Sequence, residues 1–219
     1  MDEREVLRTV PIFSELSDED ITSLAKLAAR KRYPKDTVVF FENEEGDFFF
    51  TILEGRIKVT ILGDDGREVI LSVLGPGDFF GEMALLDNEP RSATAIAVEE
   101  SELLSLHRND FQTVLNDNKS ITSALIRVLS ARLRRANHQI STLALLDVYG
   151  RVARTLLDMA EEDNGRKLIR GKVSRQDMAK IVGASREMVS RVMKDLEERG
   201  VIETLENGSV VLKELQRTD

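Results

Sequence analysis

Residues 174–199 of the chain read SRQDMAKIVGASREMVSRVMKDLEER. Ser174, with an acidic residue three positions later, has the pattern of a helix start. Ser185 has the properties of a second N-cap, and the helix that it begins is expected to end near Arg199, where a glycine follows. Gly183 lies between the two helices and tolerates the φ angles of a tight turn. Two capped helices joined by such a turn predict a helix-turn-helix motif.

The apolar residues in and after this segment support the same motif. Ala179 is small at the position where the second helix must cross the first, while Val189 and Val192 give the second helix an inward apolar face. Further along, Asn207-Gly208 separates two short apolar runs and predicts a β-hairpin. Helix, turn, helix and hairpin together predict a winged helix-turn-helix.

The outer side of the second helix is polar and charged. Four side chains project from its N-terminal half, the part that enters the major groove in this motif: Ser185, Arg186, Glu187 and Arg191. Two more lie at the start of the preceding helix, where phosphate contacts form: Ser174 and Gln176. Arginine pairs with guanine and glutamate accepts a hydrogen bond from cytosine. A solvated charged face would explain any one of these residues, but their setting in the motif favours binding to double-stranded DNA.

Composition and charge fit this expectation. The 219 residues carry a formal net charge of −8, whereas residues 166–199 contain ten basic and five acidic side chains, which favours a local site for a polyanion. The chain lacks cysteine, which excludes disulfides, zinc–thiolate sites and cysteine-held iron–sulfur clusters. It contains no long apolar run, and its first residues are charged with no apolar stretch behind them. We therefore expect a cytoplasmic protein with no membrane span and no signal peptide.

The segment from about Val38 to Leu106 has a different pattern, in which short apolar runs alternate with glycine-containing turns. Before it, Ser17 begins a short helix that we expect to reach Ala29. Six strands are expected, at Val38–Phe41, Phe48–Leu53, Arg56–Leu62, Glu68–Leu74, Ala93–Val98 and Glu102–Leu106. Strands of this length and spacing are typical of a small barrel or sandwich.

A helical stretch is expected from Asp110, and residues 119–143 are expected to form one long helix. Its apolar residues recur at intervals of four, three, four and three: Leu129, Leu133, Ala136, Ile140 and Leu143. A helix packed on its own barrel would show the same periodicity as a coiled-coil seam, but a helix this long needs a partner along its length, which favours a homodimer. Asp147 is expected to cap the next helix, which makes Leu146–Asp147 a candidate hinge, and residues 161–165 are expected to form a loop.

A candidate ligand site lies between the expected strands. Residues 81–86 predict a short helix with Gly81 at its mouth, where free backbone N–H groups suit a phosphate. Arg91 can neutralise that phosphate, Ser92 can add a hydroxyl, and Glu82 can accept a hydrogen bond from a ribose hydroxyl. The alternative is an ordinary β-bulge with a surface salt bridge between Glu82 and Arg91.

The chain resembles the cyclic-AMP receptor protein (CRP/FNR) family of bacterial transcription regulators over essentially its whole length. Four segments bear the resemblance: GPGDFFGE at 75–82, RSA at 91–93, LALLDV at 143–148 and IVGASRE at 181–187. The resemblance implies an α+β fold with three parts. These are an N-terminal β-roll (double-stranded β-helix, jelly-roll-like) sensor domain at residues 1–118, a long dimerisation helix and hinge at 119–146, and a C-terminal winged helix-turn-helix domain at 147–219.

The resemblance also implies a cyclic nucleotide effector, cyclic AMP above others, and no metal. It assigns the ligand contacts to Gly81, Glu82, Met83, Ala84, Arg91, Ser92 and Ala93, with Glu82 on the ribose 2′-hydroxyl and Arg91 and Ser92 on the cyclic phosphate. In the cyclic-AMP-responsive relative a Thr-Ser pair on the long helix reads the adenine, and Ala136 and Asn137 stand at those positions here. Asn137 retains a donor and an acceptor for a purine edge. Cyclic GMP, a cyclic dinucleotide, another effector or none stay open.

On the DNA side, the resemblance implies that Arg186, Glu187 and Arg191 read a TGTGA-like half-site of an inverted repeat, with RNA polymerase as partner. A haem-binding relative needs an axial histidine, and His107 and His138 are the two candidates. A nucleotide-sensing module of a kinase or channel would leave the helix-turn-helix unused. An enzyme is not expected, because the sequence contains no catalytic set, metal cluster or Walker loop.

Overall fold

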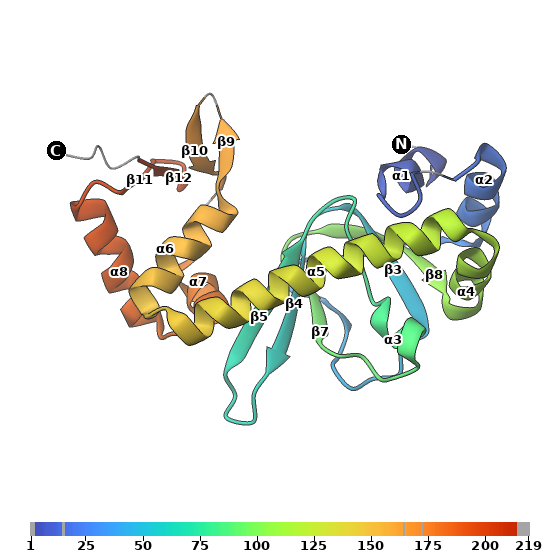
Figure 1. The fold of residues 1–219 in the computed structure, drawn as a ribbon, viewed down its shortest axis with the longest axis horizontal. Helices are drawn as coiled ribbons and strands as arrows, with labels where there is room; N and C mark the ends of the chain where they lie inside the picture. Colours follow the sequence, from blue (N-terminus) through green and yellow to red (C-terminus); the bar gives the residue numbers. More distant parts are fainter. Residues whose placement is uncertain (1–2, 15, 164, 172, 214–219) are drawn as a thin grey trace. The chain divides into compact units, whose positions relative to one another are not determined.

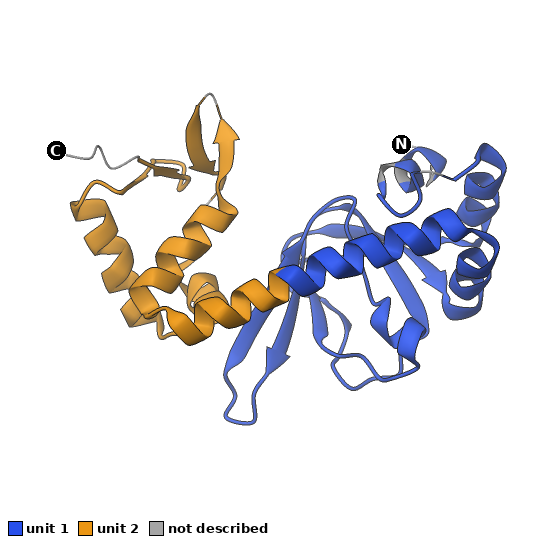
Figure 2. Ribbon diagram, in the orientation of Figure 1, with its two compact units in different colours: residues 1–134 blue, residues 135–219 orange. Residues whose placement is uncertain are grey.

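The computed structural model describes residues 3–14, 16–163, 165–171 and 173–213. The chain folds into two compact units, residues 1–134 and 135–219 (Figure 2). Within the described ranges, no helix combines the length and apolarity that crossing a membrane requires. The three-part division at residues 118 and 146 stays a prediction.

The first unit is built on two four-stranded antiparallel sheets. One has the order β1-β8-β3-β6, with β1 at Ala29–Tyr33, β8 at Ser101–His107, β3 at Phe48–Glu54 and β6 at Phe79–Phe80. The other has the order β2-β7-β4-β5, with β2 at Val38–Phe40, β7 at Thr94–Ala97, β4 at Ile57–Leu62 and β5 at Glu68–Leu74. Strands distant in the sequence are thus neighbours in both sheets, as the expected β-roll requires.

Helices cover one end of these sheets. Their bounds are Glu3–Thr9 for α1, Asp18–Leu27 for α2, Met83–Asp87 for α3, Arg108–Asp117 for α4 and Lys119–Leu145 for the long helix α5. α1, α2 and α4 gather at that end with the first turns of α5 (Figure 1). Phe49 of β3 lies at the centre of their shared core, because its ring stacks on Phe111 at 4.6 Å and on Phe79 at 5.4 Å between ring centroids.

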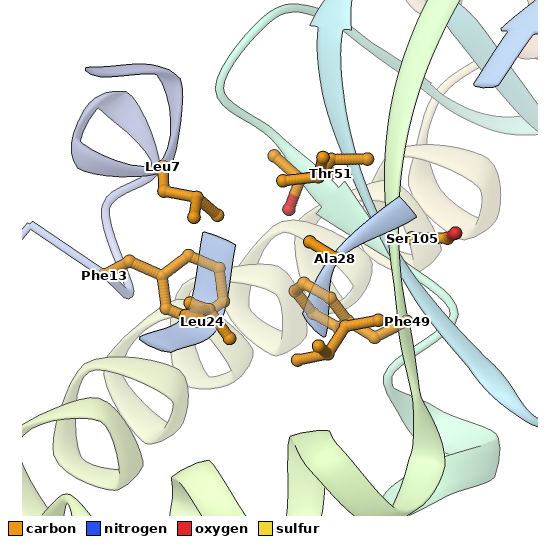
Figure 3. Close-up of a pocket in the computed structure, with 9 residues that line it drawn as sticks. Leu7, Phe13, Leu24, Ala28, Phe49, Thr51 and Ser105 are labelled. Carbon is orange, nitrogen blue, oxygen red and sulfur yellow. The ribbon is translucent and has the colours of Figure 1, made fainter. Parts of the chain in front are cut away.

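A small apolar cavity of about 10 Å³ remains in this core (Figure 3). Leu7, Phe13 and Leu24 line it from the N-terminal segment, and Phe49 and Thr51 line it from β3. Since this volume is about that of one probe sphere, the cavity is too small for any ligand larger than water.

The second unit contains the last eleven residues of α5, 135–145, and a small helix-and-strand domain. Its further elements are α6 at Val148–Met159, β9 at Glu161–Asp163, β10 at Arg166–Ile169, α7 at Arg175–Val182, α8 at Arg186–Glu198, β11 at Ile202–Thr204 and β12 at Val210–Leu212. The four strands form an antiparallel sheet in the order β11-β12-β10-β9. Val152, Val189 and Met193 are fully buried where α6 and α8 pack on α7 and the sheet.

The caps predicted for the second unit are confirmed. The side-chain oxygens of Asp147, Ser174 and Ser185 accept hydrogen bonds from the third backbone N–H after each, at 2.8, 3.2 and 3.2 Å. Gly183 ends α7 in the left-handed conformation, with φ at +62°. The predicted helix-turn-helix and its hairpin wing are therefore present.

Three predictions about secondary structure were wrong. The helix expected to reach Ala29 ends at Leu27, because Ala29–Tyr33 forms β1, which pairs with β8. The helix expected to open at Asp110 opens at Arg108, because the imidazole of His107 caps it. The loop expected at 161–165 contains strand β9, which pairs with β10, and residue 164 lies outside the described residues. Helix α1 was not predicted.

Candidate functional sites

Arg91 is an unusual charged residue of the first unit, because only 4% of its surface is exposed. Its two terminal nitrogens donate hydrogen bonds to the backbone oxygens of Gly81 and Phe48, both at 2.7 Å. Its guanidinium carbon lies 4.1 Å from the ring centroid of Phe40. Its Nε is buried and has no hydrogen-bond partner, and no carboxylate among the described residues lies within ion-pair distance of it. Burial lowers the pKa of Arg91, although the charge of Asp47 raises it in part.

Two glycines allow the backbone to enclose this guanidinium. A Cβ at Gly46 would lie 2.7 Å from the Cβ of Ala84 and 2.8 Å from the Nε of Arg91. A Cβ at Gly81 would lie 2.6 Å from an Arg91 terminal nitrogen, and Gly81 has φ at +79°. Since backbone this close to a side chain leaves no space for a methyl group, both positions require glycine.

Glu82 is buried beside Arg91 but pairs with another arginine. Only 3% of Glu82 is exposed, and its Oε1 lies 2.8 Å from the Nη1 of Arg132 on α5. The Arg132 guanidinium also lies 4.4 Å from the ring centroid of Phe79. Burial raises the pKa of Glu82, and the positive charge of Arg132 offsets part of that rise. The alternative of a surface salt bridge between Glu82 and Arg91 is therefore wrong.

The structure brings seven of the eight predicted ligand residues together around α3: Gly81, Glu82, Met83, Ala84, Arg91, Ser92 and Ala93. Ala84 and Ala93 are buried, whereas Met83 and Ser92 are exposed and touch each other, with the Ser92 hydroxyl 3.7 Å from the Met83 sulfur. Asn137, the eighth, is exposed on α5 in the second unit. The ligand roles of all eight residues stay predictions.

In the second unit, the predicted DNA-contacting residues surround the helix-turn-helix. Arg186, Glu187 and Arg191 are exposed on α8, whose opposite face is buried. Hydrogen bonds to its own backbone N–H and to the Ser185 hydroxyl lower the pKa of Glu187, so it is an anion at neutral pH. Ser174 and Ser185 use their hydroxyl oxygens as helix caps, and the Ser185 hydroxyl also donates to the Glu187 carboxylate.

A cleft of about 500 Å³ separates the helix-turn-helix from the wing. It is lined by Ser174, Arg175, Gln176 and Arg186 on one side and by Thr204, Gly208 and Val210 of the hairpin on the other. Sequence reasoning missed Arg175, whose Nη2 lies 3.8 Å from the Oε1 of Glu197. Two cations and two neutral donors facing one cleft suit a DNA phosphate.

Comparison with known proteins relates both units to described families. Residues 30–118 match the family model of the cyclic nucleotide-binding domain, and residues 150–217 match that of the Crp-like helix-turn-helix domain. The chain is 34% identical over 217 residues to the CRP-like cAMP-activated global transcriptional regulator of Mycobacterium tuberculosis, covering 97% of this chain and 96% of that protein.

Two further relatives cover nearly the whole chain. The cyclic AMP receptor protein of Thermus thermophilus is 33% identical, over 93% of each chain. The solved structure of the c-di-GMP responsive global regulator CLP of Xanthomonas campestris has a TM-score of 0.77 and 31% identity, covering 91% of this chain and 100% of that one.

Proposed function

Because the chain belongs to the CRP/FNR family of DNA-binding transcription regulators, we propose that it is a homodimeric, cytoplasmic regulator controlled by a cyclic nucleotide. Cyclic AMP is the favoured effector and TGTGA-like inverted repeats are the favoured DNA sites, with RNA polymerase as partner. The protein acts by binding, and no enzymatic step is assigned to it.

The buried guanidinium of Arg91 is the observation that carries the effector proposal. A buried charge is costly unless it is paired, and Arg91 has one buried N–H without an acceptor. A cyclic phosphate supplies both the missing charge and the missing acceptor. Glu82 provides a carboxylate for the ribose hydroxyl, and Ser92 adds an exposed hydroxyl beside Arg91.

The base of the effector is assigned to Asn137, whose amide can read a purine edge. A cyclic dinucleotide is the second candidate effector for a specific reason. The c-di-GMP responsive regulator of Xanthomonas campestris is similar over nearly the whole chain, and Ala136 offers no polar atom to an adenine.

Dimerisation is proposed to involve the exposed apolar residues of α5, which include Leu133, Ile140 and Leu143 of the predicted seam, whereas Leu129 packs on the core of the first unit. Ile126, Leu133 and Ile140 recur every seven residues and are 59, 63 and 63% exposed. Leu143 continues the series three residues later and is also exposed. Side chains of this size at this spacing favour pairing with the same helix of a second copy.

The proposed mechanism is a shift between two populations of the dimer. Ligand bound in the first unit and at Asn137 changes how the two α5 helices meet, and the DNA-binding domains turn about Leu146–Asp147. In the favoured orientation the two α8 helices are spaced by one turn of DNA, roughly 34 Å. Arg186, Glu187 and Arg191 then contact bases, with Ser185 beside them in the major groove, while Ser174 and Gln176 contact phosphates.

Fluorescence anisotropy of a labelled TGTGA inverted repeat tests this proposal. The titration is run at fixed salt with no nucleotide, with cyclic AMP, with cyclic GMP and with cyclic di-GMP, since salt alone changes such affinities. We expect one nucleotide to tighten DNA binding, and Arg91→Met to abolish that response. Arg67→Met is the matched control, because Arg67 lies on an exposed turn. If no nucleotide changes the affinity, the effector proposal fails while DNA binding stands.

A further inference from the structure

Arg108, the first residue of α4, makes an unusual number of contacts outside its own helix. Its Nη1 donates to the Oδ1 of Asn88 at 2.7 Å. Its Nη2 donates to the backbone oxygens of Gly46 at 2.6 Å and Ala84 at 3.1 Å. Its Nε lies 3.5 Å from the Oδ1 of Asp47. One guanidinium thus joins α4 to both the loop between β2 and β3 and the helix α3.

The segments that Arg108 joins are those that enclose Arg91. Gly46 and Ala84 approach Arg91 so closely that a Cβ on Gly46 would touch both Ala84 and the Arg91 guanidinium. The same loop also binds the Arg91 backbone, because the Arg91 N–H donates to the oxygen of Glu44 at 2.8 Å. The loop is fixed at its other end by the Arg108 N–H, which donates to the oxygen of Asp47 at 2.7 Å.

We propose that Arg108 is a positioning residue of the cyclic-nucleotide site, which holds the Gly46–Asp47 loop against α3 so that Arg91 is presented to the phosphate. The inference rests on the proposed function and adds to it a residue that does not itself touch the ligand. Arginine is specifically required, because its planar fork donates to three acceptors while it also faces the Asp47 carboxylate, whereas the lysine ammonium is a compact point charge.

Electrostatics agrees with this role. The pKa of Arg91 is lowered first by burial, and the nearby charge of Arg108 lowers it further, while that of Asp47 raises it. The Arg91 guanidinium nevertheless stays charged at neutral pH. Arg108 therefore adds positive potential around Arg91, which an incoming anion relieves.

If Arg108 had a purely structural role, its replacement would be expected to give a different result. A residue that only stabilises the fold would affect every ligand of the site equally. A residue that positions Arg91 affects the ligands that carry a phosphate and spares those that lack it. The comparison of a cyclic nucleotide with its nucleoside therefore separates the two roles.

Calorimetry on the full-length protein makes this comparison. Cyclic AMP and cyclic GMP are titrated directly, and adenosine and guanosine are measured by displacement, for wild type, Arg108→Met, Arg108→Lys and the matched control Arg67→Met. We expect Arg108→Met to weaken binding of the cyclic nucleotide by about 10-fold or more and binding of the nucleoside by less than about 2-fold. Arg108→Lys should lie between wild type and Arg108→Met, and the control should equal wild type.

The role of Arg108 would be overturned if Arg108→Met weakened binding of nucleotide and nucleoside equally, or weakened binding of neither. If Arg108→Met lacks a cooperative thermal transition, the same comparison is made with Arg108→Lys. In that case the role is overturned if Arg108→Lys has the same ratio of cyclic-nucleotide to nucleoside affinity as the wild type. A wild type that binds neither cyclic nucleotide overturns the proposed function itself, which is a different result from a binding wild type with an unaffected Arg108 variant.

Discussion

Replacing Arg132 by methionine should destabilise the first unit by leaving the buried carboxylate of Glu82 without its ion-pair partner. The Glu82 side chain is 4% exposed and that of Arg132 is 30% exposed. Removal of one partner from a fully buried ion pair costs about 3–5 kcal/mol. Because water reaches part of Arg132, we expect a smaller loss of about 2–3 kcal/mol in the free energy of unfolding at neutral pH.

The loss should grow as the pH rises. Burial raises the pKa of Glu82, so the folded state binds more protons than the unfolded state between the ordinary carboxyl pKa and the raised one. Stability is therefore highest below the unfolded pKa and falls as the pH rises through the folded pKa. Arg132 limits this fall in the wild type, since its charge lowers the pKa of Glu82. Without Arg132 the folded-state pKa of Glu82 is higher, so the pH range over which stability falls extends to higher pH.

Urea unfolding at one fixed protein concentration measures both effects, because the stability of a dimer depends on its concentration. The series is wild type, Arg132→Met, Glu82→Gln and the double variant. We expect the double variant to regain most of the stability that Arg132→Met loses, since the buried carboxylate is then replaced by a neutral amide. Equal stabilities of Arg132→Met and the double variant would show that the buried carboxylate is not the cause.

Four further changes test other parts of the molecule. Gly183→Ala should cost about 1 kcal/mol through backbone strain, measured by urea unfolding, since φ is +62° there and the nearest atom to a new Cβ is 3.8 Å away; a neutral result would refute that strain. Arg186→Ala should lose about 1–3 kcal/mol of preference at one base pair in anisotropy titrations, whereas a uniform loss would indicate a phosphate contact. Asn137→Ala should lower nucleotide affinity in calorimetry and leave ligand-free DNA binding unchanged, and an unaltered affinity removes Asn137 from the site. Leu133→Glu should produce monomers in sedimentation velocity, and a persistent dimer would place the interface elsewhere.

Sequence reasoning worked where structure is decided by neighbouring residues. The caps at Asp147, Ser174 and Ser185 follow from a side chain and the backbone N–H three residues ahead, so the start of each helix was readable. The same holds for β5, whose bounds were predicted residue for residue between two glycine turns. Such features need no knowledge of the rest of the chain.

Sequence reasoning failed where the structure of a segment is decided by a residue or strand far along the chain. Ala29–Tyr33 reads ARKRY, which has no strand periodicity, and it becomes a strand because β8 offers it an edge and Glu102 pairs with both Arg30 and Arg32. The partner of Glu82 is 50 residues away on α5, and the contacts of Arg108 span up to 62 residues. No local pattern marks such pairs.

The candidate ligand site combines the two cases. The sequence identified Glu82, which follows Gly81, and Arg91 as charged groups of the site, but whether the protein itself pairs each of them depends on burial and on distant partners. Glu82 forms an ion pair with Arg132, whereas the Nε–H of Arg91 has no acceptor. Since an unmatched buried donor costs more free energy than a matched one, Arg91 gains more than Glu82 from an incoming ligand. A ligand that binds both must therefore provide an anion, whereas its hydroxyl has to compete with Arg132 for Glu82.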